Sequence, residues 1–415
     1  MEGGGQDISL TSVNVRPKNI YGLRMDVIGN IHFNLNQEVI YPVEGALAFH
    51  DYVSNKQRFL RFPDETHPLI IAISSQRRLL AVLEDCPKIG SNISIYDLTS
   101  LKKRRSLELP NETKGVQIAQ IAFTQDSKAI VALTKGPEEM LYMMVLDKTS
   151  KVIEGRPTNN YSRGMAESIA INPQESGLIA VCGENILMTM CKSEKGFSIN
   201  NSIKSNFYST SMAFLAADVL IVGTSEDELI LVENGEIKFR QKASDAEMFD
   251  LLWDADQMER ELEHRILSDV KLFDKRVVCM TAFPTGFAFA IYNKVFVFEK
   301  GLKSKYERKT ILTVPITIYA DHLYQITNMA IDSKQETVIV TTKHSQIYVG
   351  ILIVPETLKA KHLKFQPLGV LLHIADIIDV SFCSWKPIIM TASQITIPIF
   401  MQFSRYISFT SVDVH

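Results

Sequence analysis

A repeated two-strand unit dominates this sequence, and its clearest copy occupies residues 117–133. In residues 121–123 the large side chains of Ile121 and Phe123 point to one face and the small Ala122 points to the other, which is the period of two expected of a β-strand. Residues 124–128 are polar and can form a turn, because their side chains can bond their own backbone. Residues 130–133 are then all apolar, which predicts a strand covered on both faces.

The same unit recurs along the chain. Its copies share a small residue at the centre of the first strand, namely Ala72, Ala122, Ala170, Ala213, Ala330 and Ser381. Where the copies are adjacent they lie about 43 to 51 residues apart, close to the period of a WD40 propeller blade. The wider gap before Ala330 holds one more copy, at residues 280–290, and an insertion. The sequence therefore predicts an all-β, WD40-like propeller of seven blades, followed by one further blade-like unit.

This repeat sets the predicted domain boundaries. We expect a disordered, Gly-rich tail over residues 1–16, the propeller over 17–365, and an extra blade-like unit with a diverged tail over 366–415. The seven predicted blades occupy residues 31–62, 68–109, 116–153, 165–199, 208–239, 277–314 and 326–365.

The composition of the chain restricts the cellular compartments in which we expect the protein and the classes of molecule that we expect it to bind. The formal net charge of the 415-residue chain is -3, so no global field draws it to nucleic acid or to an anionic membrane. The N-terminus carries no secretory signal, and no apolar run approaches the roughly 18 residues of a membrane span. The five cysteines are scattered, which fits reduced thiols buried as small hydrophobes. We therefore expect a cytoplasmic protein with neither nucleic acid nor membrane as partner.

The insertion between blades five and six has a different pattern. Over residues 244–272 apolar side chains recur at spacings of three and four, which predicts an amphipathic helix with an acidic outer face. One interpretation is a helix laid over the propeller edge. The other is a partner-docking helix, since a propeller needs no helix to close. Its candidate contact residues are Leu252, Trp253, Met258 and Leu262.

Several short segments carry a family resemblance. Residues 21–24 (Tyr-Gly-Leu-Arg) and 94–98 (Ser-Ile-Tyr-Asp-Leu) resemble segments of the ciliary WD-repeat family called cilia- and flagella-associated protein 57. Residues 221–225, 295–300 and 386–391 are similar to further segments in the same order. The resemblance implies that this chain corresponds to a first propeller and the opening blade of a second.

The same resemblance carries functional expectations. It implies a non-catalytic scaffold of the motile ciliary or flagellar axoneme, which assembles or anchors inner dynein arms on doublet microtubules. Inner-arm dynein and tubulin are then the expected partners, and the cytoskeleton is the expected location. Residues 393–400 depart from the family pattern, because they lack the aspartate and the tryptophan of the corresponding strand.

Catalytic and cofactor motifs are absent from the sequence. It contains no nucleophile elbow, phosphate loop, dinucleotide fingerprint, His-Glu-x-x-His or Cys-x-x-Cys, so we expect no enzyme, cofactor or metal site. His32 and His373 stand alone in apolar strands, which favours satisfied core residues over ligands. The alternative to an axonemal scaffold is a general cytosolic adaptor, for example in ubiquitin ligation or trafficking.

One basic run stands out in blade two, formed by Lys102, Lys103, Arg104 and Arg105. The simplest interpretation is a charged outer edge that blunts unwanted strand pairing. The functional alternatives are a nuclear-import-like patch or a contact for the acidic tails of tubulin. The family resemblance favours tubulin.

Overall fold

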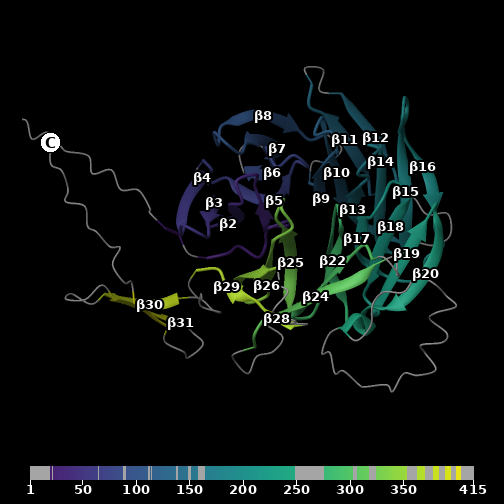
Figure 1. The fold of residues 1–415 in the computed structure, drawn as a ribbon. Helices are drawn as coiled ribbons and strands as arrows, with labels where there is room; N and C mark the ends of the chain where they lie inside the picture. Colours follow the sequence, from purple (N-terminus) through teal and green to yellow (C-terminus); the bar gives the residue numbers. More distant parts are fainter. Residues whose placement is uncertain are drawn as a thin grey trace, which may run out of the picture.

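The structure, a computed structural model, describes residues 19–20, 22–63, 65–86, 90–110, 113, 115–136, 139–147, 151–157, 164–247, 275–301, 306–316, 324–352, 362–369, 377–382, 388–393 and 399–402. Within these residues, seven sheets stand as blades around a common centre, in sequence order, and their pairing is antiparallel except for one parallel pair in blade six (Figure 1). This arrangement is a seven-bladed β-propeller and confirms the predicted fold class.

Each of the first four blades is a meander in which every strand pairs with the next. Blade one consists of β1 (His32–Phe33), β2 (Val39–Val43), β3 (Ala46–Asp51) and β4 (Lys56–Arg61). Blade two consists of β5 (His67–Ile73), β6 (Leu79–Cys86), β7 (Gly90–Asp97) and β8 (Lys103–Glu108). Blade three consists of β9 (Gln117–Phe123), β10 (Ala129–Lys135), β11 (Leu141–Val145) and β12 (Val152–Gly155). Blade four consists of β13 (Met165–Ile171), β14 (Leu178–Glu184), β15 (Ile186–Ser193) and β16 (Gly196–Ser202).

The remaining blades follow the same plan with one addition. Blade five consists of β17 (Ser209–Phe214), β18 (Val219–Thr224), β19 (Glu228–Glu233) and β20 (Glu236–Lys242). Blade six consists of β21 (Val277–Phe283), β22 (Gly286–Ile291), β23 (Lys294–Glu299), β24 (Glu307–Thr313) and a fifth strand, β28 (His362–Lys364). Blade seven consists of β25 (Ile326–Ile331), β26 (Thr337–Thr342), β27 (Ile347–Ile351) and β29 (Gln366–Pro367).

The second strand of each blade contributes side chains to two separate hydrophobic cores, one shared with the preceding blade and one shared with the following blade. Ile130 and Ala132 of β10 pack in the cluster shared with blade two, whereas Val131 and Leu133 pack in the cluster shared with blade four. All four side chains are 0 % exposed. Because successive side chains of a strand point to opposite faces, a strand between two blades must be apolar throughout. The unbroken apolar run predicted for this strand is therefore confirmed.

The turn between the first two strands is closed by the side chain that begins it. In five described turns that residue is buried and polar, namely Asn34, Ser74, Thr124, Asn172 and Asp332. Thr124 Oγ1 accepts a hydrogen bond from the Ala129 N–H at 3.0 Å, and Asp332 Oδ1 accepts one from the Thr337 N–H at 2.9 Å. These bonds supply partners to backbone N–H groups that would otherwise be buried without one. The polar turn predicted at residues 124–128 is thus confirmed.

A short segment links the outer edges of blades six and seven. Strand β28 pairs in parallel with β24, and β29 then pairs with β27. Phe365, between the two strands, is 2 % exposed and lies in the core shared by these blades. Residues 366–367 therefore complete blade seven, two residues beyond the predicted end of the propeller at residue 365.

Blades one and seven close the ring through side chains. Among the described residues no strand is shared between these two blades. Phe33 and Tyr41 of blade one pack with Ile339 and Ile347 of blade seven. Across the same boundary the hydroxyl of Tyr52 and Thr337 Oγ1 lie 3.3 Å apart. We call this boundary the seam.

Arg77 spans the seam from one blade further away. Its Nη2 donates to the carbonyl of Ile331 in blade seven at 2.6 Å, so the side chain joins blade two to blade seven past blade one. Burial lowers the pKa of Arg77, and the nearby carboxylate of Asp332 opposes that shift.

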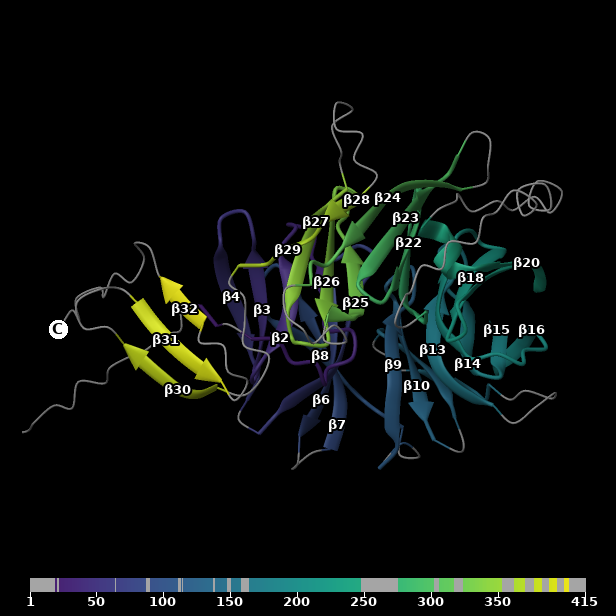
Figure 2. The same ribbon diagram turned by 90° about the horizontal axis from the view of Figure 1, so that it is seen from below.

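The C-terminal strands form a separate three-stranded sheet of β30 (Ile377–Phe382), β31 (Ile388–Ser393) and β32 (Ile399–Gln402). Figure 2 shows this sheet to one side of the ring. Of the predicted helical insertion at 244–272, the structure describes only the start, where Ala243–Glu247 form a 3-10 helix. Residues 248–272, the predicted tail at 1–16 and His373 lie outside the described residues.

Candidate functional site

Cationic side chains gather where the hairpin turns of blade two meet one face of the ring. In an antiparallel meander the turn after the first strand and the turn after the third lie at the same end of the sheet. Residues 74–78 and 98–102 are these two turns. They bring Arg78 close to the basic run, and we call this region the blade-two turn face.

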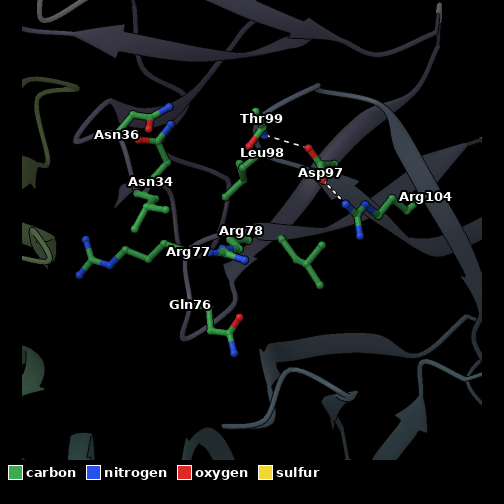
Figure 3. Close-up of a pocket in the computed structure, with 11 residues that line it drawn as sticks. Asn34, Asn36, Gln76, Arg77, Arg78, Asp97, Leu98, Thr99 and Arg104 are labelled. Carbon is green, nitrogen blue, oxygen red and sulfur yellow. Dashed lines mark hydrogen bonds and ion pairs between the residues drawn. The ribbon is translucent and has the colours of Figure 1, made fainter.

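A cavity of about 530 Å³ lies between blades one and two on this face. Figure 3 shows the side chains that line it, with the guanidinium of Arg77 pointing away from Arg78 and Arg104. The lining is mainly polar, and its residues are Asn34, Leu35, Asn36, Gln76, Arg77, Arg78, Leu79, Asp97, Leu98, Thr99 and Arg104.

A second cavity, of about 500 Å³, lies between blades two and three. Its apolar part is formed by Leu79, Ile95, Val145 and Leu146, and its remaining lining residues are Arg104, Arg105, Ser127, Lys128 and Asp147. Leu79 and Arg104 line both cavities, so the two are adjacent across the turns of blade two.

Lys103 of the basic run is held by a buried carboxylate. Its Nζ lies 3.3 Å from Glu84 Oε2 and 5.9 Å from the centre of the Tyr96 ring. Glu84 is 3 % exposed and also accepts hydrogen bonds from Ser94 Oγ at 2.7 Å and the Tyr96 hydroxyl at 2.5 Å. Burial and the adjacent carboxylate together raise the pKa of Tyr96. Lys103 on β8 therefore pairs with the buried carboxylate of Glu84 on β6.

The other three cations of the run differ in their surroundings. Arg104 forms an ion pair with Asp97, whose pKa is lowered to about 2 by hydrogen bonds from Ser100 and by Arg104 itself. Arg105 donates to the backbone carbonyls of Leu146 and Asp147 in blade three, the first at 3.0 Å. Lys102 is exposed in the turn that precedes β8. The run thus lies on a blade edge, and three of its four side chains have partners within the protein.

The basic run is joined by two cations to which the sequence analysis assigned no role. Arg78 and Lys128 are both exposed, and no ion pair among the described residues joins either to a carboxylate. Each is the last residue of the first hairpin turn in its repeat, residues 74–78 in blade two and 124–128 in blade three. A cation at the same position of successive repeats was the signal that could have identified them.

The central channel forms a third cavity, of about 660 Å³, lined by the first strand of every blade. Its lining is mixed polar and apolar and includes His32. The Nε2–H of His32 donates to the carbonyl of Ile71 at 3.3 Å, and burial lowers the pKa of this imidazole to about 4. His32 is hydrogen-bonded, as predicted for a satisfied residue, but it is half-buried in the channel wall and does not belong to the core.

The imidazole of His32 predicts a pH-dependent loss of stability. Unfolded histidine takes up a proton below about pH 6.5, whereas folded His32 resists until about pH 4, so acid favours the unfolded chain. Between these values the free energy of unfolding should fall by up to about 3 kcal/mol, at about 1.4 kcal/mol per pH unit. Urea unfolding at several pH values, compared between wild type and His32→Gln, measures this contribution. Equal pH dependence in both proteins would contradict it.

Other candidate features lie outside the described residues or carry no site. The predicted docking residues Leu252, Trp253, Met258 and Leu262 are not among the residues that the structure describes. In the part that it describes, no group of three His, Cys, Asp or Glu is arranged to hold a metal ion, and no helix could span a membrane. Burial raises the pKa of Cys182 and of Cys279 to about 12, which favours the protonated thiol at both positions.

Comparisons with known proteins agree with this architecture. No protein-family model matches the chain. Mouse (Mus musculus) cilia- and flagella-associated protein 57 is 24 % identical over 417 residues, which is 92 % of this chain and 33 % of the mouse protein. The match confirms the family resemblance found in the sequence. The chain spans about one third of the length of this curated relative.

Solved structures show the likeness of fold alone. A chain in a crystal structure of the mitotic checkpoint complex superposes with a TM-score of 0.55 at 9 % identity, over 84 % of this chain and 98 % of the other. The β-propeller domain of Cps50 (Swd1) from Myceliophteria thermophila superposes with a TM-score of 0.51 at 11 % identity, over 81 % and 97 %.

Proposed function

We propose that this chain is a non-catalytic WD-repeat scaffold of the motile ciliary or flagellar axoneme. The observation that carries the proposal is the match to cilia- and flagella-associated protein 57 over 92 % of the chain. The fold supports a binding role as well, because a propeller presents many loops on a rigid ring and such loops are common contact surfaces. Fold alone would not support a location, since propellers host unrelated functions.

The finer proposal concerns the partners. We propose inner-arm dynein and the tubulin of doublet microtubules, so that the chain helps to assemble or anchor dynein arms. For tubulin, the supporting observation is the cationic side chains of the blade-two turn face, since positively charged surfaces attract the acidic tails of tubulin. Lys102 is exposed in the turn that precedes β8 and is the member of the basic run best placed for such a contact.

Localisation tests the proposal directly. A tagged chain produced in cells with motile cilia should remain on the axoneme after detergent extraction. A matched unrelated propeller with the same tag should be released by the same treatment. A diffuse cytosolic signal for this chain would contradict the axonemal role and favour a general adaptor.

A further inference from the structure

We infer that the blade-two turn face binds an extended peptide that carries acidic residues beside an aliphatic anchor. The inference deepens the proposed scaffold function and rests on it for the general idea of a protein partner. The site comprises the two adjacent cavities that flank the turns of blade two.

The cavity between blades two and three provides the anchor site. Leu79, Val145 and Leu146 are only half-buried there, and Ile95 beneath them is 3 % exposed. Half-buried aliphatic side chains around a hollow gain from covering, because the apolar area removed from water stabilises the complex. A leucine or isoleucine side chain has the chemistry to pack against these aliphatic residues and occupies only part of the hollow.

The rim of the same cavity provides the charge. Lys128 lies on its blade-three side, Arg78 lies in the neighbouring cavity, and both lack an ion-paired carboxylate among the described residues. Arg104 lies between them, and its side chain is 61 % exposed although it is paired with Asp97. Cations around an apolar hollow match carboxylates that flank an aliphatic residue in the ligand.

The two halves can act on one ligand because they share residues. Leu79 and Arg104 line both cavities, so a single extended segment can place its anchor in one and its carboxylates over the other. The framework below the site is fixed. The Leu146 N–H donates to the Lys128 carbonyl at 2.7 Å, and the Leu98 N–H donates to the Arg78 carbonyl at 3.0 Å.

The lining favours a peptide over a nucleic acid. Single-stranded nucleic acid is held by aromatic side chains on which its bases stack. Neither cavity contains an aromatic residue. The apolar hollow has no role in binding a bare phosphate backbone.

Fluorescence anisotropy with the purified chain tests the inference. The probe is the labelled peptide Glu-Asp-Leu-Leu-Glu-Asp, and its matched probe has both leucines replaced by serine. We expect the serine peptide to bind on the order of tenfold more weakly, since the anchor loses its apolar burial. We also expect affinity to fall as salt rises from about 50 to about 300 mM, because screening weakens the charge contacts.

Charge variants test the rim. Arg78→Glu and Lys128→Glu should each weaken binding of the leucine peptide on the order of tenfold. Lys334→Glu is the matched control, because it is an exposed cation in the corresponding turn of blade seven and lines neither cavity. Thermal unfolding should show that all three variants remain folded, since the replaced side chains are exposed.

Several outcomes would overturn the inference. These are no binding of the leucine peptide, equal binding of the serine peptide, equal loss in Lys334→Glu, or displacement by oligothymidine as efficient as by unlabelled peptide. Failure here is separable from failure of the proposed function. A chain retained on the axoneme without peptide binding would refute only the docking site, whereas peptide binding by a chain that is diffuse in cells would refute only the axonemal role.

Discussion

Replacing Phe289 by alanine is expected to lower the free energy of unfolding by about 3–5 kcal/mol, the largest single effect that the structure predicts. Phe289 belongs to a cluster of four phenylalanines in blade six, all 0 % exposed, which also contains Phe287, Phe296 and Phe298. The Phe289 ring stacks on that of Phe296 with centroids 5.1 Å apart. The cluster fills the core between blades five and six, so the substitution leaves a cavity that rigid neighbouring sheets cannot close.

Urea unfolding followed by circular dichroism measures this loss. The control is Val53→Ala, which also shortens an apolar side chain but at a position 83 % exposed, where the change should stay within about 0.5 kcal/mol. A loss below about 1 kcal/mol for Phe289→Ala would show that the four rings do not form a tightly packed core.

Reversing the charge of Lys103 is expected to destabilise blade two by about 2 kcal/mol. Glu84 is 3 % exposed and would lose its only ion-pair partner among the described residues, while a second carboxylate arrived beside it. Breaking a fully buried pair costs about 3–5 kcal/mol, and we expect less here because the Lys103 side chain is 43 % exposed and solvent screens it. Lys102→Glu is the adjacent control, with an expected effect within about 0.5 kcal/mol.

This difference decides how microtubule binding should be tested. A variant with the whole run reversed would weaken co-sedimentation whether the run touches tubulin or merely holds blade two together. Lys102→Glu changes the surface charge without a described partner to lose, so a weaker co-sedimentation of this variant would support a contact. Thermal unfolding of the same preparations would show which variants remain intact, and unchanged binding by stable Lys102→Glu would argue against the patch.

Much of the propeller could be read from the sequence because the repeat is encoded locally. A buried strand that faces two cores must be apolar throughout, and residues 130–133 show that pattern directly. The turn at residues 124–128 was also readable, since the Thr124 side chain bonds a backbone group only five residues away. Strand β28 was not readable, because three residues carry no periodicity and their parallel pairing with β24 is set by tertiary contacts.

The candidate site was only half visible for a similar reason. The run Lys102–Arg105 stands out as four consecutive cations, but its partners lie far away in sequence. Glu84 precedes Lys103 by 19 residues, and the carbonyl of Leu146 follows Arg105 by 41. The strand register of blades two and three therefore determines which of these cations pair within the protein and which remain available to a partner.

The seam between blades one and seven gives the ring a mechanical weak point. Every other pair of neighbouring blades is joined by the chain itself, whereas the seam is crossed by side-chain contacts such as those of Phe33 and Ile339 and by the Arg77 bond to Ile331. Tension applied through the chain before Gly22 acts on blade one, and tension applied after Gly369 acts on blade seven. Under tension the ring is therefore expected to open at the seam before any other boundary between blades.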